Sequence, residues 1–300
     1  MLVRKAYANW EVRAPAKLNL LLEVLAKRDD DFHEIETLMV PINLFDTLYF
    51  TSNSTGRVEL SCQWARAGPT VDQPPDDFPR GADNLVVRAV ELVRQRFGVR
   101  EGADLRLVKR IPTAAGLGGG SSDAAAALTV ANRAWNLQLS AQQLNALAAE
   151  LGSDVPFFLV GGPAVARGRG ERLEPVDRLG RLHLVVAKPR PRLSTGAVFA
   201  ACRPADKPRH LAPLIDALRA GQLATVGRRL FNRLEEAAAT LTTAVDLMRR
   251  ELEHVGCPGS QMSGSGTSFF ALCRHARHAR RVAGRLRARG LFAFAACSCR

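Results

Sequence analysis

A glycine-rich segment that runs directly into an alanine-rich stretch constrains this chain more than any other feature. The segment reads Ile111-Pro112-Thr113-Ala114-Ala115-Gly116-Leu117-Gly118-Gly119-Gly120-Ser121-Ser122-Asp123, and four alanines follow it. Glycine lets the backbone approach a ligand closely and adopt positive φ. We expect a helix to begin near Ser121 and Ser122, and the free N–H groups at a helix start favour phosphate. The segment therefore predicts a site for a phosphorylated ligand.

Two familiar phosphate loops do not fit this segment. A Walker A loop ends in Gly-Lys-Ser/Thr, whereas Gly120 is followed directly by Ser121. The dinucleotide fingerprint needs glycine at position 121 and an acidic residue about 20 residues later, and residues 132–144 contain no acid. A flexible linker is the bland alternative, but the strand-like pattern before the segment and the alanine helix after it argue against one.

Size and composition are those of an ordinary globular protein. A chain of 300 residues suggests one large or two modest domains, and 47% hydrophobic residues can build a core. No apolar run reaches the roughly 18 residues of a membrane span, and residues 1–10 lack a signal-peptide core. We therefore expect a cytoplasmic protein with no membrane partner.

The six cysteines form no C-x-x-C pair, so we expect free thiols and no metal site.

The net charge of +13 comes mostly from arginine, and it suggests either nucleic acid or small anions as partners. The charge is spread along the chain, and aromatic residues make up only 6%, so stacking platforms for bases are scarce. The densest basic cluster, 274–289, alternates with Val282 and Leu286 at helical spacing, which is typical of the exposed face of a packed helix. We favour a small anionic ligand and no nucleic-acid partner.

The order of patterns along the chain favours an α+β fold, because strands and helices do not alternate strictly. Strand-like patterns cover residues 18–24, 38–50, 58–64, 105–111, 157–160, 182–187 and 291–296. Within 38–50, Pro41 and residues 43–46 predict interruptions of the strand. Helical patterns cover 84–97 with Asp83 as N-cap, 211–218, 226–234 and 240–252, and a Ser140–Gln143 capping box opens a helix that Gly152 ends. Residues 72–80 predict a loop. A Pro189-Arg190-Pro191 hinge predicts domains 1–187 and 188–300.

Three further features could carry chemistry. Lys17, one of only six lysines among 42 basic residues, stands at the head of an apolar strand and could supply the positive charge that the glycine segment lacks. Asp154 follows a helix end and could accept a proton from an attacking hydroxyl. A second glycine turn, 262–268, could present N–H groups to an anion. The alternatives are a snorkelling surface lysine, an aspartate that bonds its own turn and a simple connecting turn.

These pieces, in this order, resemble the GHMP kinase superfamily, with 112–126 as the ATP loop and 262–267 as its third motif. Further motifs narrow the resemblance to kinases that act on 4-diphosphocytidyl-2-C-methyl-D-erythritol in the non-mevalonate isoprenoid pathway. These motifs are Pro15-Ala16-Lys17-Leu18-Asn19-Leu20, Lys27-Arg28 through Phe32-His33, Asp83-Asn84-Leu85, Leu151-Gly152-Ser153-Asp154-Val155-Pro156-Phe157-Phe158 and Gly168-Arg169-Gly170-Glu171. The resemblance covers about residues 12–275.

The resemblance implies a GHMP kinase fold. This fold has an N-terminal domain like ribosomal protein S5 domain 2, with a left-handed β-α-β connection, and a ferredoxin-like C-terminal domain. It also implies phosphorylation of the substrate's 2-hydroxyl by ATP, with Mg²⁺ as further cofactor. Lys17 and Asp154 would form the catalytic pair. The residues that would bind ATP are Pro112, Thr113, Ala114, Ala115, Gly116, Leu117, Gly118, Gly119, Gly120, Ser121 and Ser122.

For the cytidine-diphosphate substrate, the resemblance implies hydrogen bonds from Asn19 and His33 to cytosine. Phe32 and Phe199 would sandwich the base, with Thr195 beside it. The substrate site would be completed by Ser263 and Gly264. We expect a monomer or a weak homodimer.

The chain departs from this family pattern at three positions. Asp31 replaces a glycine before the aromatic residue and His33, and a positive φ there would strain aspartate less than most residues. Arg233 replaces an acid in Asn232-Arg233-Leu234-Glu235, and Phe32 often appears as tyrosine. Two other hypotheses remain open. One is a GHMP kinase for another small alcohol, such as homoserine or mevalonate, and the other is an anion- or nucleic-acid-binding protein without catalysis.

Overall fold

Two long strands, β2 (Asn9–Lys27) and β3 (His33–Asn53), supply residues to both of the compact units into which the chain divides. The structure is a computed structural model that describes residues 1–6, 9–65, 78–79 and 81–299. Unit 1 comprises Met1–Ala16, Leu44–Thr113 and Gly118–Gly161, and unit 2 comprises Lys17–Asn43, Ala114–Leu117 and Gly162–Arg300. Both units are built from segments that are far apart in the sequence.

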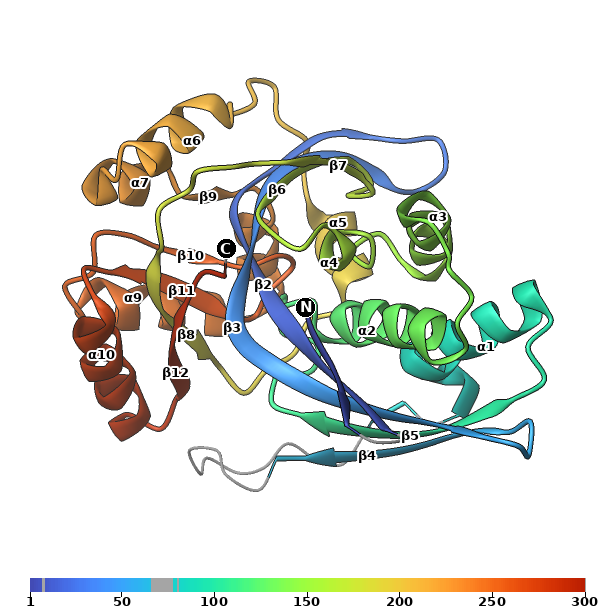
Figure 1. The fold of residues 1–300 in the computed structure, drawn as a ribbon. Helices are drawn as coiled ribbons and strands as arrows, with labels where there is room; N and C mark the ends of the chain where they lie inside the picture. Colours follow the sequence, from blue (N-terminus) through green and yellow to red (C-terminus); the bar gives the residue numbers. More distant parts are fainter. Residues whose placement is uncertain (7–8, 66–77, 80, 300) are drawn as a thin grey trace. The chain divides into compact units, whose positions relative to one another are not determined.

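Unit 1 is a sheet covered by helices (Figure 1). Its strands, besides the ends of β2 and β3, are β1 (Leu2–Ala6), β4 (Val58–Trp64) and β5 (Gly102–Lys109). Its helices are η1 (Gly81–Asp83), α1 (Leu85–Phe97), α2 (Gly119–Ala134), α3 (Ala141–Leu151) and α4 (Phe157–Val160). β4 and β5 are parallel and α1 lies between them in the chain, which makes a β-α-β connection.

Small side chains let the unit 1 helices pack closely. Ala124, Ala125, Ala126 and Ala127 of α2 are all fully buried, and α2 contacts α1 along its length. The Ser140–Gln143 capping box and the end of α3 at Gly152 are confirmed. The predicted N-cap of α1 was wrong by one residue: the Asn84 side chain accepts the Val86 N–H, while Asp83 ends η1.

Two strand predictions were wrong. Residues 157–160 form the short helix α4, because Pro156 already has helical dihedrals and its carbonyl accepts the Leu159 N–H. Four apolar residues fit a strand or a buried helical turn equally well, so only the surroundings decide. β3 runs without a break past Pro41, contrary to the predicted interruption there and at 43–46. The loop predicted at 72–80 lies almost entirely outside the described residues.

Unit 2 contains a four-stranded antiparallel sheet in the order β10-β11-β8-β12. These strands are β10 (Ser260–Met262), β11 (Phe269–Cys273), β8 (His183–Lys188) and β12 (Phe292–Cys297). β6 (Ala164–Gly168) pairs with β3 and with β7 (Arg172–Pro175), and β9 (Phe231–Asn232) pairs with β2. Its helices are α5 (Thr195–Ala201), α6 (Ala212–Arg219), α7 (Leu223–Arg229), α8 (Leu234–Leu241), α9 (Ala244–Glu253) and α10 (Ala276–Ala288).

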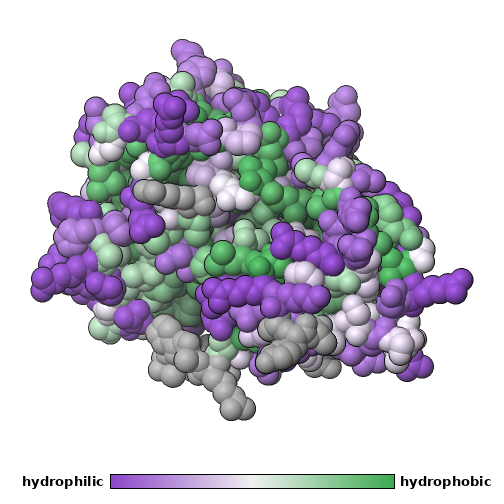
Figure 2. All heavy atoms as spheres, viewed as in Figure 1, coloured by the Kyte–Doolittle hydropathy of each residue, from purple (hydrophilic) through white to green (hydrophobic). Residues whose placement is uncertain are grey.

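The basic helix α10 shows how charge is placed in unit 2. Val282 and Leu286 are fully buried and join the unit 2 core, which confirms the predicted packed face. α10 lies against β8 and β12 (Figure 1), and its arginines are exposed. Hydrophilic side chains cover much of the face shown in Figure 2. Within the described ranges, no helix is both long enough and apolar enough to cross a bilayer.

Candidate active site

The glycine segment leads from β5 into α2, and its backbone needs glycine at two positions. Gly116 and Gly118 have φ values of 71° and 68°, in the left-handed region. A Cβ at Gly116 would lie 1.9 Å from the Ser263 carbonyl oxygen within unit 2, so no other residue fits there. α2 begins at Gly119, two residues before the predicted start, and Gly118 is its N-cap. The first N–H groups of α2 therefore receive no capping side chain from Gly118.

Near the start of α2 in unit 1, three polar atoms have no hydrogen-bond partner among the described residues. Thr113 Oγ1, Ser122 Oγ and Asp123 Oδ1 are buried, and the described part of the chain offers none of them a hydrogen bond. A buried polar atom without a partner costs free energy, and native proteins keep few of them. Such oxygens at a helix start are suited to a bound ligand or ion.

Next to these atoms, unit 1 buries an ion cluster that the sequence analysis missed. Lys109 Nζ lies 2.5 Å from Asp123 Oδ2 and also contacts Asp46 Oδ2. Asp46 Oδ1 accepts the Ile111 N–H at 2.9 Å and also the Arg110 N–H, so the cluster holds the chain at the entrance to the glycine segment. Lys109 is one of the six lysines, and the rarity that drew attention to Lys17 was also the available signal here.

Burial and charge oppose each other in this cluster. Burial raises the pKa of Asp123 to about 8, Asp46 adds to the rise, and the Lys109 ammonium limits it. Burial disfavours the charged Lys109, but the carboxylates of Asp123 and Asp46 outweigh it, so the pKa of Lys109 is raised. One ammonium thus faces two acidic side chains, and burial raises the pKa of Asp123 more than the ammonium lowers it.

In unit 2, Lys17 is buried and belongs to a chain of polar contacts. Its Nζ donates to Asn19 Oδ1 at 2.7 Å, and its backbone N–H donates to the Leu117 carbonyl at 2.9 Å. Asn19 Nδ2 donates to Thr37 Oγ1 at 2.9 Å. Lys17 is therefore not a snorkelling surface lysine, because only 4% of the residue is exposed. Both polar atoms of the Asn19 side chain already have a protein partner.

The second glycine turn of unit 2 meets the middle of the glycine segment. Ser263 Oγ donates to the Gly116 carbonyl at 3.0 Å and accepts the Asn19 N–H at 3.4 Å. A Cβ at Gly264 would lie 3.2 Å from Lys17 Nζ. Asn232 Nδ2 donates to the carbonyls of Met262 and Gly264 at 2.9 and 2.8 Å and holds this turn. Unit 2 thus brings together five of the predicted site residues, namely Lys17, Asn19, Gly116, Ser263 and Gly264.

The predicted base-binding residues form two separate contacts in unit 2. His33 and Phe199 lie with ring centroids 5.2 Å apart, tilted by 37°. Phe32 is 46% exposed, and the Arg169 guanidinium covers its ring at 4.7 Å. Thr195 Oγ1 lies 2.9 Å from Ser265 Oγ. Burial lowers the pKa of His33, and Lys27 acts in the same direction, so His33 is neutral near pH 7.

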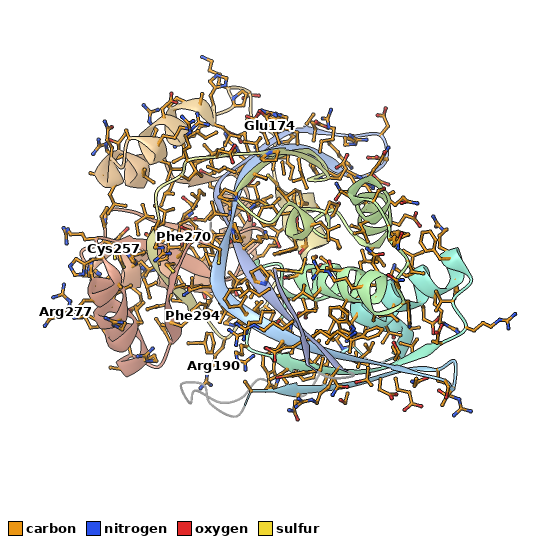
Figure 3. All side chains as sticks on the ribbon, in the orientation of Figure 1. Glu174, Arg190, Cys257, Phe270, Arg277 and Phe294 are labelled. Atoms are coloured by element: carbon orange, nitrogen blue, oxygen red, sulfur yellow. The ribbon has the colours of Figure 1, made fainter. Side chains whose placement is uncertain are left out.

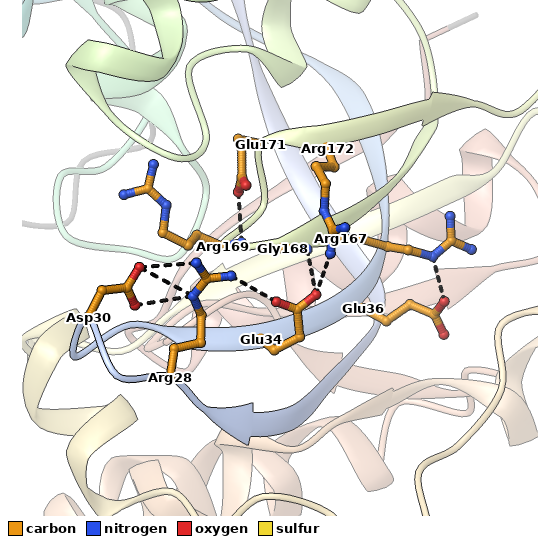
Figure 4. Close-up of polar contacts among 9 residues, drawn as sticks. All are labelled: Arg28, Asp30, Glu34, Glu36, Arg167, Gly168, Arg169, Glu171 and Arg172. Carbon is orange, nitrogen blue, oxygen red and sulfur yellow. Dashed lines mark hydrogen bonds and ion pairs between the residues drawn. The ribbon is translucent and has the colours of Figure 1, made fainter.

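A network of ion pairs fixes the turn that carries Phe32 and His33 (Figure 4). Arg28 contacts Asp30 at 3.1 Å and Glu34 at 3.0 Å, and Glu34 also binds Arg172 at 2.5 Å. Asp31 has a φ of 62°, in the left-handed region that glycine adopts most readily and that aspartate tolerates better than most residues.

The comparisons with known proteins agree with one another. The model for the GHMP kinases N terminal domain matches residues 84–162, and that for the GHMP kinases C terminal domain matches 214–290. A protein from Pelotomaculum thermopropionicum named 4-diphosphocytidyl-2-C-methyl-D-erythritol kinase is 43% identical over 91% of this chain and 92% of its own length. A protein of that name from Bacillus subtilis is 36% identical over 92% of both chains. This chain belongs to the 4-diphosphocytidyl-2-C-methyl-D-erythritol kinases.

Solved structures extend the likeness of this family member to the fold. A crystal structure titled 4-(cytidine 5'-diphospho)-2C-methyl-D-erythritol kinase matches with a TM-score of 0.78 and 38% identity over 96% of this chain and 98% of its own. The mevalonate kinase of L. major in complex with R-mevalonate has a TM-score of 0.74 at 16% identity over 99% and 98% of the two chains, which shows a shared fold only. The predicted GHMP kinase fold is confirmed.

The other half of the predicted catalytic pair of this kinase, Asp154, belongs to unit 1. It is half-buried in the turn between α3 and α4, where Gly152 ends one helix and Pro156 starts the next. Its pairing with Lys17, like the roles of all the site residues, stays a prediction.

Proposed function

We propose that this kinase transfers the γ-phosphoryl group of ATP to the 2-hydroxyl of 4-diphosphocytidyl-2-C-methyl-D-erythritol, with Lys17 and Asp154 as its catalytic pair. One observation carries the role of Lys17: its buried ammonium joins, through Asn19 and Ser263, the Gly116 carbonyl of the glycine segment. A buried cation in contact with a phosphate loop has a clear use in phosphoryl transfer, because that reaction depends on positioning and charge stabilisation.

In this proposal Asp154 accepts the proton of the 2-hydroxyl as that oxygen attacks phosphorus. Lys17 supplies positive charge to the reacting centre. Lys17 also helps to orient the hydroxyl. The Leu151–Phe158 motif supports the choice of Asp154, because it is one of the motifs on which the family resemblance rests.

ATP fits the glycine segment, whose backbone leaves no room for side chains at Gly116 and whose helix begins with uncapped N–H groups. Mg²⁺ fits the same region, because it prefers hard oxygen ligands and Ser122 Oγ and Asp123 Oδ1 are buried oxygens without a described partner. Ser122 and Asp123 are the residues that would hold the ion. When bound, Mg²⁺ would neutralise charge on the phosphates.

His33, Phe199 and Phe32 would recognise the cytosine. The neutral imidazole of His33 can donate one hydrogen bond and accept another, and the aromatic rings offer stacking area. Phe32 has an exposed face and carries the Arg169 cation, which could also meet a diphosphate oxygen. A competing base would leave the polar groups unpaired, which is a strong source of discrimination.

Phosphorus NMR tests the proposal directly. The protein is incubated with ATP, Mg²⁺ and 4-diphosphocytidyl-2-C-methyl-D-erythritol, and a new phosphomonoester signal is expected. Homoserine and mevalonate should give no such signal, and phosphorylation of either in preference to the cytidyl compound would favour the alternative GHMP kinase.

We further propose that the protein acts in the cytoplasm as a monomer or weak homodimer, without nucleic-acid or membrane partners.

Substitution tests the catalytic pair. Lys17→Ala and Asp154→Asn should fold and lose on the order of 10²-fold or more in kcat. Lys207→Ala and Asp206→Asn, at exposed positions, are matched controls that should keep full activity. Near-normal turnover by both Lys17→Ala and Asp154→Asn would end the assignment.

A further inference from the structure

Unit 2 contains a cluster of thiols and imidazole that phosphoryl transfer does not use. It consists of Cys257, Cys273 and His278, and one potential ligand atom from each lies within 4.8 Å of the others. Cys273 ends β11, His278 lies in the first turn of α10, and Cys257 lies between α9 and β10. Figure 3 shows Cys257 near α10, while Arg277 of that helix projects outward. Three elements therefore meet at these side chains.

The two sulfurs already have the separation that a tetrahedral ion requires. Cys257 Sγ and Cys273 Sγ lie 3.8 Å apart. Two thiolates that each lie about 2.3 Å from a tetrahedral zinc ion are about 3.8 Å from one another. The ligand nitrogen of His278 lies within 4.8 Å of both sulfurs, so a small approach of the imidazole would complete a third ligand position.

The surroundings of His278 are those of a metal-binding imidazole. Its Nδ1 accepts the Arg274 N–H at 3.3 Å, a long bond that a metal could replace. The Val255 backbone also hydrogen-bonds the ring. Metal-binding histidines commonly donate their second N–H to a backbone carbonyl, which fixes the tautomer.

Access and charge also fit a cation. Cys273 and His278 are buried, whereas Cys257 is half-buried and leaves a way in from solvent. Arg274, which follows Cys273 directly in the chain, is one of the arginines near the sulfurs. Two thiolates and a divalent ion together carry no net charge, so the nearby arginines would not oppose binding.

We propose that Cys257, Cys273 and His278 form a zinc site, with water as the fourth ligand. Thiolate and imidazole ligands select Zn²⁺ over Mg²⁺ or Ca²⁺. Binding forms two Zn–S bonds and one Zn–N bond and releases the two thiol protons to solvent. The ion ties the start of α10 to the end of β11 and to the segment before β10. It stabilises unit 2 and takes no part in the phosphoryl transfer.

Metal titration tests the site. The full chain, stripped with a chelator and kept reduced, is titrated with Zn²⁺ and separately with Co²⁺. We expect one equivalent of Zn²⁺ per chain, a rise in Tm with Zn²⁺, and a thiolate-to-cobalt charge-transfer band. Cys257→Ser and His278→Gln should each weaken Zn²⁺ binding by more than the roughly 10- to 100-fold that loss of a supporting group costs.

The controls lie in the same unit. Cys202→Ser removes a buried thiol whose hydrogen bonds go to backbone carbonyls elsewhere, and His254→Gln removes an exposed imidazole nearby. Both should bind Zn²⁺ like the parent chain. Circular dichroism checks that each variant folds, and Cys257→Ser, at a half-buried position, keeps the test valid if His278→Gln unfolds. Absence of a stoichiometric ion, or binding that survives Cys257→Ser, overturns the proposal.

Discussion

At position 116, both the backbone conformation and the space available exclude any residue except glycine. Its φ is positive, and its Cα faces the Ser263 carbonyl so closely that a methyl group has no room. Ser263 cannot move away from Gly116 without breaking hydrogen bonds. Its N–H donates to the Ser268 carbonyl, and its Oγ accepts the Asn19 N–H within unit 2. The position therefore requires glycine for both space and conformation.

We expect Gly116→Ala to abolish ATP turnover, because the glycine segment must leave its folded path. The change should lower kcat/KM for ATP by about 10²-fold or more, since displacement by about 1 Å can have that effect. Steady-state kinetics measures it. Gly284→Ala is the control, since a Cβ there would meet no described atom within 4 Å. Equal activity of the two variants would contradict this account.

Asp123 makes stability depend on pH. Its folded-state pKa of about 8 lies above the ordinary value of 3.8, so the folded protein binds one more proton between those pH values. Its contribution to the free energy of unfolding therefore falls as pH rises through that window, and it is fully present only below the unfolded pKa.

Asp123→Asn should remove this dependence, because asparagine mimics the protonated acid and does not titrate. Urea unfolding from about pH 5 to about pH 8 should show a slope less negative by at most about 1.4 kcal/mol per pH unit. The exposed Asp206→Asn should leave the slope unchanged. A parent-like slope in Asp123→Asn would show that this carboxyl is ionised throughout.

At the scale of the elements, a contact between β2 and the segment before α8 explains why the chain has arginine at position 233, where the family resemblance led us to expect an acid. Arg233 stands between β9 and α8 and binds the fully buried Glu23 of β2 through two bonds of 2.6 and 3.1 Å. Its backbone N–H also donates to the Leu22 carbonyl at 2.8 Å, next to the β2–β9 pairing. An acid at position 233 would face the Glu23 carboxylate, so the arginine found here has the charge that this contact needs.

Arg233→Met should lower the free energy of unfolding by about 3–5 kcal/mol, because Glu23 would be buried without its partner. Adding Glu23→Gln to that variant should restore part of the loss, since it removes the uncompensated charge. Chemical denaturation of the parent, of Arg233→Met, of Glu23→Gln and of the double variant measures the coupling. Arg96→Met breaks the exposed Arg96–Glu150 pair and should cost about 1 kcal/mol or less. A similar loss in Arg233→Met and Arg96→Met would refute the role of burial.

For the chain as a whole, the charge of +13 comes from basic residues spread along the sequence and not from one segment. The arginines of α10 are exposed around a buried apolar stripe, as an ordinary surface helix requires. Charge of this kind attracts small anions and, weakly, any polyanion.

We expect only non-specific DNA binding, which should disappear as salt rises from about 50 to about 200 mM because it depends on counterion release. Gel shifts across that range, with ATP turnover measured in the same buffers, provide the test. Sequence-specific binding that persists at the higher salt would favour the non-catalytic hypothesis.

Local patterns were enough for much of the fold, and they brought Lys17 and the glycine segment to attention. The glycine segment, the capping box at Ser140 and the buried face of α10 depend on residues near one another in the chain, so spacing alone predicts them. The motifs also placed the chain among the GHMP kinases, which the comparisons confirm. The predicted domain boundary at residue 187 stays a prediction. The two compact units are each assembled from several segments of the chain, so they are not continuous domains that could be compared directly with 1–187 and 188–300.

Long-range contacts decided the rest. Residues 157–160 could have been strand or helix, and only their surroundings in unit 1 made them α4. Spacing could not reveal that Lys109 meets Asp46 and Asp123, or that Cys257 meets His278, because those partners come from different elements. Side-chain pattern specifies local conformation through steric and hydrogen-bonding preferences, whereas burial of charge and convergence of ligands exist only once distant segments pack together.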